Sequence, residues 1–264
     1  MVESLAFVDP AAQRPDEPLA VNDYRAQRLF CDVPLGAGEV ITCDSDQANY
    51  LLNVLRLATG DSILVFNGVD GEWRTTVAQS GKRRCSLEVV EQVRTQSGGP
   101  DIDYLFAPLK RARLDYMVQK ATELGVGRLR PVYTRHTVAE RVNLQRMKAN
   151  VIEASEQCGI LRLPTICEPK KLSSIVAEWQ VSRTLIFADE SAKVASPLAV
   201  LEGVARGPCA VLVGPEGGFA EAERNLLLHQ SFTVPISLGP RIMRADTAAV
   251  AALALINSVL GDWR

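Results

Sequence analysis

Two short glycine-containing loops carry the residues best suited to hold a ligand. The loop Gly214-Pro215-Glu216-Gly217-Gly218 follows the apolar run 210–213, and Gly239-Pro240 follows the apolar run 234–238. Runs of this length and composition are typical of buried strands. Because the carboxyl ends of neighbouring parallel strands meet at one edge of a sheet, the two loops predict a pocket. In it, backbone amides and carbonyls would hold a flat ligand.

The same residues argue against the common phosphate sites. Neither loop contains GxxxxGK[ST] or GxGxxG, so a triphosphate cradle and a dinucleotide fold are poorly supported. The carboxylate of Glu216 would also repel a phosphate placed against it. The loops therefore favour a cofactor that carries positive charge, or an adenosine without phosphates.

Alternating strands and helices position these loops. From residue 102 onward the sequence predicts strands at 104–107, 129–133, 165–167, 184–188, 210–213 and 234–238. The helices between them are predicted at 112–124, 143–158, 172–179, 197–205, 220–229 and 246–260. This alternation indicates an α/β domain with a mainly parallel sheet. Residues 248–256 of the last helix are all apolar, so we expect that helix to be buried on every side.

A strand-rich unit comes before this domain. Strands are predicted at 28–33, 39–43, 62–66, 72–77 and 85–90, and one helix at about 45–55 with Ser45 as its N-cap. Short strands packed into so few residues indicate a small closed or half-closed β-barrel. Gly98, Gly99 and Pro100 mark a linker. We expect an extended arm at 1–24, the barrel at 25–95, the linker at 96–101 and the α/β domain at 102–264.

Composition limits the kinds of partner. With 47% apolar residues, 23% charged residues and a net charge of −2, any contact with nucleic acid must come from a local basic patch. The 6 cysteines form no CxxC pair and there are only 2 histidines, which argues against a metal site. No signal peptide or membrane-spanning run is apparent. We expect a cytoplasmic protein that binds neither metal nor membrane.

Several stretches together resemble one family. LVGPEGGF (212–219) followed by SLGPRIMRADTAA (237–249) is similar to the knotted, SPOUT-class methyltransferases. More narrowly, the chain resembles the RsmE family, which methylates N3 of a uridine in the 16S ribosomal RNA of the small subunit. NYLLNVLRLATGD (49–61), LKRARLDYMVQKATELGV (109–126) and EASEQCG (153–159) agree in the expected order. The resemblance covers about 27–256.

This resemblance implies a fold, a cofactor and an assembly. It implies a trefoil knot near the carboxyl terminus, a PUA-like RNA-binding fold for the barrel, a homodimer and S-adenosylmethionine (SAM) as the cofactor. The residues expected to bind SAM are Phe187, Ala188, Leu212, Val213, Gly214, Pro215, Glu216, Gly217, Leu238, Gly239, Ile242, Met243, Thr247 and Ala248.

Arg244 and Glu216 are the expected catalytic residues. Uridine N3 carries a proton at neutral pH, so the enzyme must help to remove it or stabilise the anion that forms. Arg244 could stabilise charge on the uracil oxygens, although a salt bridge to Asp246 or Glu216 is the alternative. Glu216 could orient the amino group of the cofactor or act as the base. Family members commonly have Thr-Glu where this chain has Ala245-Asp246.

Ten residues are expected to contact RNA, by their charge or by their place in the resembling stretches. They are Arg28, Arg56, Lys110, Arg111, Arg113, Arg135, Arg141, Glu156, Gln157 and Arg162. The alternative for each is an ordinary solvated side chain. The family usually places an arginine soon after the glycine of EASEQCG, where this chain has Ile160.

Three other functions remain open at this point. A knotted methyltransferase could act on another RNA, such as transfer RNA, or on a ribose hydroxyl. The protein could also be a ribosome assembly factor that binds cofactor without turnover. A general α/β nucleotide-binding module is the third alternative, and the absence of a phosphate-binding motif disfavours it.

Overall fold

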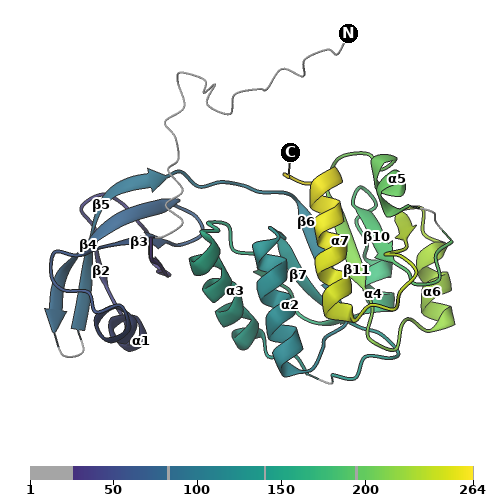
Figure 1. The fold of residues 1–264 in the computed structure, drawn as a ribbon, viewed down its shortest axis with the longest axis horizontal. Coiled ribbons are helices and arrows are strands. Elements are labelled where there is room, and N and C mark those ends of the chain that lie inside the picture. The colour runs from purple at the N-terminus through teal and green to yellow at the C-terminus, as the bar shows by residue number, and fades with distance from the viewer. Residues whose placement is uncertain (1–25, 82–83, 140, 194–195, 264) are drawn as a thin grey trace, which may run out of the picture.

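Two sheets, joined by a single connecting segment, organise the chain (Figure 1). The structure is a computed structural model that describes residues 26–81, 84–139, 141–193 and 196–263. The arm expected at 1–24 lies outside these residues. The first sheet has 5 strands and precedes the connection, and the second has 7 strands and follows it.

The first sheet forms the barrel-like unit, with strand order β1-β3-β4-β5-β2. β1 pairs with β3 in parallel, and the other neighbours are antiparallel. Ala48 and Leu51 of the helical segment lie in its core. The strands are β1 (Arg28–Phe30), β2 (Val40–Thr42), β3 (Ser62–Phe66), β4 (Glu72–Gly81) and β5 (Arg84–Arg94).

The helix expected at 45–55 is two helices of different kinds. α1 (Ser45–Asn49) begins after Asp44, whose carboxylate accepts hydrogen bonds from the backbone N–H groups of Asp46 and Gln47. Asp44, and not Ser45, is therefore the N-cap. The π-helix η1 (Tyr50–Val54) continues it, and the Leu55 N–H donates to the Tyr50 carbonyl at 2.9 Å.

The second sheet is parallel throughout, as the alternating pattern predicted. Its order is β12-β10-β11-β6-β7-β8, and the short β9, which was not predicted, also pairs with β7. The strands are β6 (Ile102–Phe106), β7 (Arg128–Tyr133), β8 (Thr165–Ile166), β9 (Lys170–Lys171), β10 (Thr184–Ala188), β11 (Cys209–Val213) and β12 (Thr233–Ile236).

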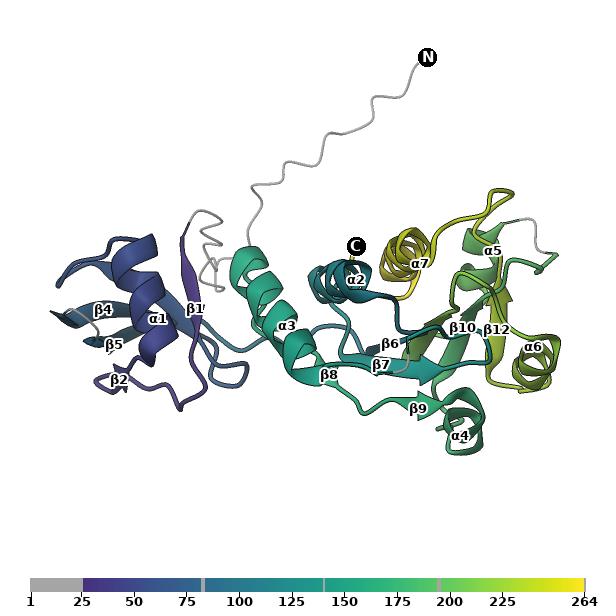
Figure 2. The same cartoon turned by 90° about the horizontal axis from the view of Figure 1, so that it is seen from below.

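Helices cover both faces of this sheet (Figure 2). One face carries α2 (Arg111–Glu123), α3 (Leu144–Cys158), α5 (Pro197–Glu202) and α7 (Ala245–Val259). The other carries α4 (Leu172–Ala177) and α6 (Glu221–Leu228). Successive strand side chains point to opposite faces. Tyr104 and Phe106 therefore join the core under α2 and α7, whereas Leu105 joins the core under α4 and α6.

The expectation that the last helix is buried on every side is wrong for this single chain. α7 buries Ala249, Ala252, Leu253 and Ile256 against the sheet and α2. Its other apolar face, which includes Val250, Ala251 and Ala254, is only half-buried. The trefoil knot stays a prediction.

Candidate active site

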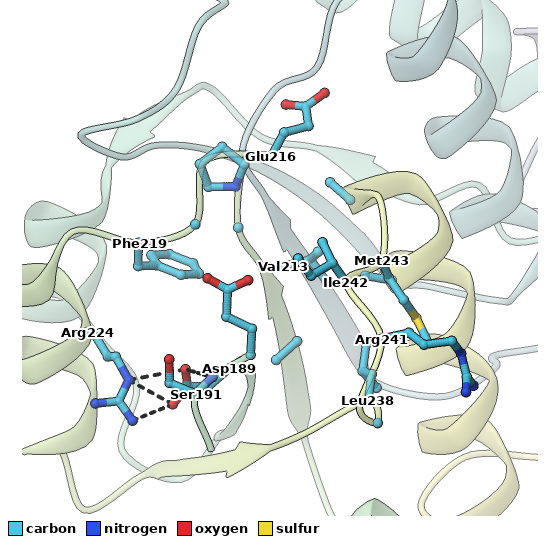
Figure 3. Close-up of a pocket in the computed structure, with 18 residues that line it drawn as sticks. Asp189, Ser191, Val213, Glu216, Phe219, Arg224, Leu238, Arg241, Ile242 and Met243 are labelled. Atoms are coloured by element: carbon cyan, nitrogen blue, oxygen red, sulfur yellow. Dashed lines mark hydrogen bonds and ion pairs between the residues drawn. The ribbon is translucent and has the colours of Figure 1, made fainter. Parts of the chain in front are cut away.

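The two predicted loops do lie together, at the carboxyl ends of three adjacent strands (Figure 3). They enclose a cavity of about 140 Å³ after β10, β11 and β12. Its lining residues are Ala188, Asp189, Glu190, Ser191, Val213, Gly214, Pro215, Glu216, Gly218, Phe219, Arg224, Leu238, Gly239, Arg241, Ile242, Met243, Ala245 and Ala248. This edge of a parallel sheet is where α/β proteins usually bind ligands.

Glycine is required at two positions of the first loop. A Cβ atom at residue 214 would lie 2.5 Å from the ring of Phe219, which itself lines the cavity. Gly218 has a φ of 65°, and a Cβ there would lie 2.8 Å from the carboxylate of Glu190. The Gly218 N–H closes the turn by donating to the Pro215 carbonyl at 2.9 Å. The two glycines therefore let Phe219 and Glu190, which both line the cavity, pack against the backbone of the loop.

The segment after β7 holds this loop from outside. Nδ1–H of His136 donates to the carbonyls of Gly217 and Gly218, at 3.1 and 3.2 Å. The backbone N–H of Arg135 donates to Glu223 at 2.8 Å, and the same carboxylate accepts from the Ala220 N–H at the start of α6. The first turn of α6 and residues 135–136 therefore fix the carboxyl-terminal end of the loop.

A buried carboxylate that the sequence analysis missed lies at the end of β10. Asp189 is 4% exposed and pairs with Arg224 of α6 at 2.8 Å. Glu190 and Ser191 follow it along the cavity wall. The sequence does indicate this position, because Asp189 and Glu190 come directly after a predicted buried strand, as the two glycine loops do.

The second loop brings two apolar side chains and the cation of Arg241 to the rim. Gly239 takes a φ of 108°, which allows the chain to turn back towards α7. Ile242 is 97% exposed although it is apolar, and Met243 beside it is half-buried. Arg244 is the exposed N-cap residue of α7. In the described part of the chain, Arg244 forms no salt bridge with Asp246 or Glu216.

Glu216 instead pairs with a residue expected to contact RNA. Its carboxylate lies 3.0 Å from the guanidinium of Arg113, in the first turn of α2. Both side chains are close to half exposed, so the pair lies at the mouth of the pocket. This contact places α2 beside the first loop.

Most of the residues expected to bind SAM line the cavity. Four do not. Phe187 and Leu212 are fully buried in the core under α4 and α6, with the Phe187 ring behind Phe219. Gly217 and Thr247 are exposed and lie outside the lining.

A basic groove lies between the amino-terminal ends of α2 and α3. Lys110, Arg111 and Arg141, all expected to contact RNA, line this cavity of about 690 Å³ together with Arg146. Arg146 pairs with Asp115 at 2.6 Å. Arg113, two residues after Arg111, pairs with Glu216, so the groove lies next to the mouth of the first pocket. Arg56, Arg135 and Gln157 are exposed elsewhere.

The expectation that Arg28 faces RNA is wrong. Arg28 is 5% exposed and its guanidinium pairs with Glu72 at 2.8 Å. Two other expected contacts are also engaged within the protein. Glu156 accepts a hydrogen bond from the Phe30 N–H at 2.8 Å, and Arg162 donates to the carbonyls of Gly99 and Pro100. These side chains join the barrel and the connecting segment to the second domain.

The thiols are not suited to nucleophilic chemistry. Burial raises the pKa of Cys31 and of Cys43 to about 12, and that of Cys209 to about 11. These thiols stay protonated near neutral pH. Among the described residues, no group of three or more His, Cys, Asp or Glu could hold a metal ion. No helix in that part of the chain is long and apolar enough to cross a membrane.

Comparison with known proteins decides the family. Residues 97–257 match the family model of an RNA methyltransferase domain, and residues 43–90 match that of an RNA methyltransferase PUA domain. The chain belongs to this RNA methyltransferase family. The first domain is accordingly PUA-like, as the resemblance implied.

Relatives and solved structures agree over most of the chain. It is 31% identical to the ribosomal RNA small subunit methyltransferase E of Rickettsia conorii, over 87% of this chain and 94% of that protein. A Legionella pneumophila protein solved in complex with SAM is 26% identical, with a TM-score of 0.78 over 90% of this chain and 99% of that one. The SAM-bound methyltransferase E of Neisseria gonorrhoeae has the same fold, with a TM-score of 0.78 at 24% identity, over 90% of this chain and 100% of its own.

Proposed function

We propose that this protein transfers a methyl group from SAM to N3 of a uridine in the ribosomal RNA of the small subunit. The observation that carries the proposal is the pocket between the two glycine loops, in a chain that spans 94% of a relative named for this class of RNA. A cytoplasmic location belongs to the proposal, because the substrate is part of the ribosome.

The residues of the pocket fit SAM. Gly214 and Gly218 let the Phe219 ring and the Glu190 carboxylate pack close to the first loop, where both side chains line the cavity. Val213, Leu238 and Met243 provide apolar walls. Glu190 and Glu216 suit a ligand with a sulfonium and an ammonium group. The 26% identical Legionella protein, whose structure contains SAM, supports the same assignment.

We infer that Arg244 stabilises the substrate anion. SAM, when bound, supplies an electrophilic methyl group. The uracil must lose its N3 proton to become nucleophilic, and the negative charge then spreads onto its oxygens. The Arg244 guanidinium is exposed beside the second loop and makes none of the salt bridges found among the described residues, so it is available to these oxygens.

Glu216 could have either of two roles, and steady-state kinetics can distinguish between them. Arg113 holds its carboxylate at the mouth of the pocket, where it can attract the cofactor ammonium or accept the N3 proton. If it binds the ammonium, Glu216→Gln should raise KM for SAM and leave kcat nearly unchanged. If it is the base, the same variant should lower kcat.

The RNA would lie along the basic groove and reach the barrel. Lys110, Arg111 and Arg141 provide positive charge beside the pocket in a protein whose net charge is −2. Such clustered cations suit a phosphate backbone. Arg56, exposed on the PUA-like domain at a φ of 59°, is the corresponding contact on the barrel.

We also propose a homodimer that covers the half-buried face of α7. This face carries Val250, Ala251 and Ala254, which the described chain leaves only half-buried. A second copy would bury these side chains, which is the usual fate of a contiguous apolar helix face.

Transfer of a labelled methyl group to separate RNA pools tests the proposed function. The protein would be incubated with SAM carrying a labelled methyl and with small subunits, large subunits or transfer RNA from cells that lack the modification. The proposal predicts label in small-subunit RNA only. Label in transfer RNA would identify a methyltransferase for a different RNA, and SAM binding without transfer to any pool would indicate an assembly factor.

A further inference from the structure

The carboxyl-terminal turn of α3 lies against the barrel, away from the pocket. α3 is the helix of the second domain nearest to the barrel (Figure 2). Its last turns contain the stretch EASEQCG, which the active site does not use. Glu156 accepts the Phe30 N–H of β1 at 2.8 Å, and the Gly159 carbonyl accepts from the Arg94 guanidinium at 2.9 Å. Two hydrogen bonds therefore cross between the domains here.

The barrel side of this contact is built around one buried carboxylate. Glu72 is 1% exposed and pairs with Arg28 at 2.8 Å. It also pairs with Arg94 through both carboxylate oxygens, at 2.8 and 2.9 Å. Glu72 thereby ties together β1, β4 and β5 and orients the guanidinium that reaches Gly159. A buried cluster of this kind holds one geometry, because moving either arginine would leave the buried carboxylate with only one of its two partners.

The end of α3 packs closely against the same cluster. Gly159 is the C-cap of α3 and has a φ of 65°, a conformation that strains other residues. A Cβ there would lie 3.3 Å from the guanidinium of Arg28. The end of α3 can approach the Arg28–Glu72 pair this closely only because residue 159 is glycine.

We propose that Glu72, Arg28 and Arg94, together with Glu156 and Gly159, form a joint that fixes the barrel against the methyltransferase domain. The connection between the domains contains Gly98 and Gly99 and would otherwise allow many orientations. The joint makes Glu72 and Glu156 positioning residues, since it presents the barrel and the active site to the RNA as one surface. This consequence rests on the proposed function, because it requires both domains to bind the same RNA.

The first test changes the helix side, where folding is least at risk. Glu156→Ala removes the acceptor for the Phe30 N–H, whereas Glu156→Gln keeps an oxygen there. Loss of a fixed orientation should raise KM for small subunits by about tenfold, with kcat changed by less than about twofold. The dissociation constant for SAM, measured by calorimetry, should not change. Glu156→Gln should restore the wild-type KM. Glu153→Ala, one turn earlier on exposed α3 surface, is the matched control.

The second test changes the barrel side and observes the joint directly. Glu72→Gln leaves two arginines around a neutral amide, and Glu88→Gln makes the same change at an exposed position of β5. X-ray scattering in solution should show a broader distribution of interdomain distances for Glu72→Gln and Glu156→Ala than for either control. If Glu72→Gln does not fold, Glu156→Ala still decides the question.

Two results would overturn the joint. One is a folded Glu156→Ala protein whose scattering profile and KM for RNA equal those of the wild type. The other is a loss of kcat with unchanged KM, which would assign Glu156 to the chemistry. If the wild type transfers no methyl to any RNA, the proposed function fails, and the scattering comparison still tests the joint.

Discussion

At the scale of single residues, Gly214 and Phe219 determine the shape of the cofactor pocket. The ring of Phe219 occupies the space where a side chain at 214 would lie, and it also packs edge-on against Phe187 at 5.0 Å between ring centroids. The ring is therefore held between the core and the loop. A methyl group at 214 must displace either the ring or the backbone that faces the ligand.

Gly214→Ala should weaken SAM binding. Overpacking of this kind costs about 1–3 kcal/mol, which corresponds to roughly 5–150-fold in the dissociation constant if the strain falls on the bound loop. Calorimetry with SAM measures it. Gly98→Ala is the matched control, because a Cβ there meets nothing within 4 Å. An unchanged dissociation constant in Gly214→Ala would show that the loop does not contact the cofactor.

Glu156 gives a prediction about pH. Burial raises the pKa of its carboxyl above the usual value, and Glu153 adds to this, while the hydrogen bond from Phe30 acts in the opposite direction. Because the folded protein binds this proton more tightly than the unfolded chain, stability falls as pH rises from about 4.5, the unfolded value, through the folded pKa. Glu156→Gln cannot ionise and should avoid this loss.

The unfolding temperature of Glu156→Gln should therefore exceed that of the wild type at pH 7, and the two should converge at pH 4. Thermal unfolding by circular dichroism at both pH values provides the comparison. A variant that is less stable than the wild type by the same amount at both values would contradict the sign of the shift.

The glycine loops could be predicted from sequence, whereas Arg28 and Glu156 could not. A glycine run directly after an apolar strand can be recognised from neighbouring residues alone. Arg28 and Glu156 look like surface charges, and their partners, Glu72 and Phe30, are 44 and 126 residues away in the chain. Only tertiary packing brings these residues together. Asp189 lies between these cases, since its position after a strand was visible but its pairing with Arg224 was not.

At the scale of elements, α7 connects the active site to the proposed dimer. Its amino-terminal end carries Arg244, which lies in the chain between the pocket-lining residues Met243 and Ala245. Its half-buried face carries Val250, Ala251 and Ala254. The periodic pattern predicted the parallel sheet and its helices, because strand and helix periods differ along the chain. It gave the wrong burial for α7, since a helix that is apolar all round can be covered by a second copy as well as by its own chain.

Ala251→Glu should shift the protein from dimer to monomer. A charge at this position would have to be buried without a partner in the proposed interface. Sedimentation velocity measures the change in mass, and Ala177→Glu, at an exposed position of α4 on the opposite face of the sheet, is the control. A wild-type protein that sediments as a monomer, or a dimeric Ala251→Glu protein, would rule out this interface.

At the scale of the whole molecule, the two domains and the basic groove must bind the same RNA. The net charge of −2 gives no general attraction for nucleic acid, so binding depends on where the cations are placed. Lys110, Arg111 and Arg141 lie beside the pocket, and the joint around Glu72 holds the barrel in a fixed relation to them. The sequence indicated both domains but not how they meet.

Arg141→Ala should reduce the salt dependence of RNA binding. Each phosphate contact contributes about 0.7–0.9 to the slope of log K against log salt concentration, so the slope should fall by about that amount. Fluorescence anisotropy with a labelled small-subunit RNA fragment over a salt series measures it. Lys171→Ala, exposed on β9, is the control. An unchanged slope in Arg141→Ala would show that the groove does not contact the RNA phosphates.

Mapping the methylated base tests the central claim most directly. Small ribosomal subunits that lack the modification would be incubated with the protein and SAM, and their RNA would be digested and analysed by mass spectrometry. The proposed reaction should give a single 3-methyluridine, absent with Arg244→Ala although that variant still binds SAM. A methyl group on a ribose hydroxyl or on another base, or none on any ribosomal RNA despite SAM binding, would contradict it.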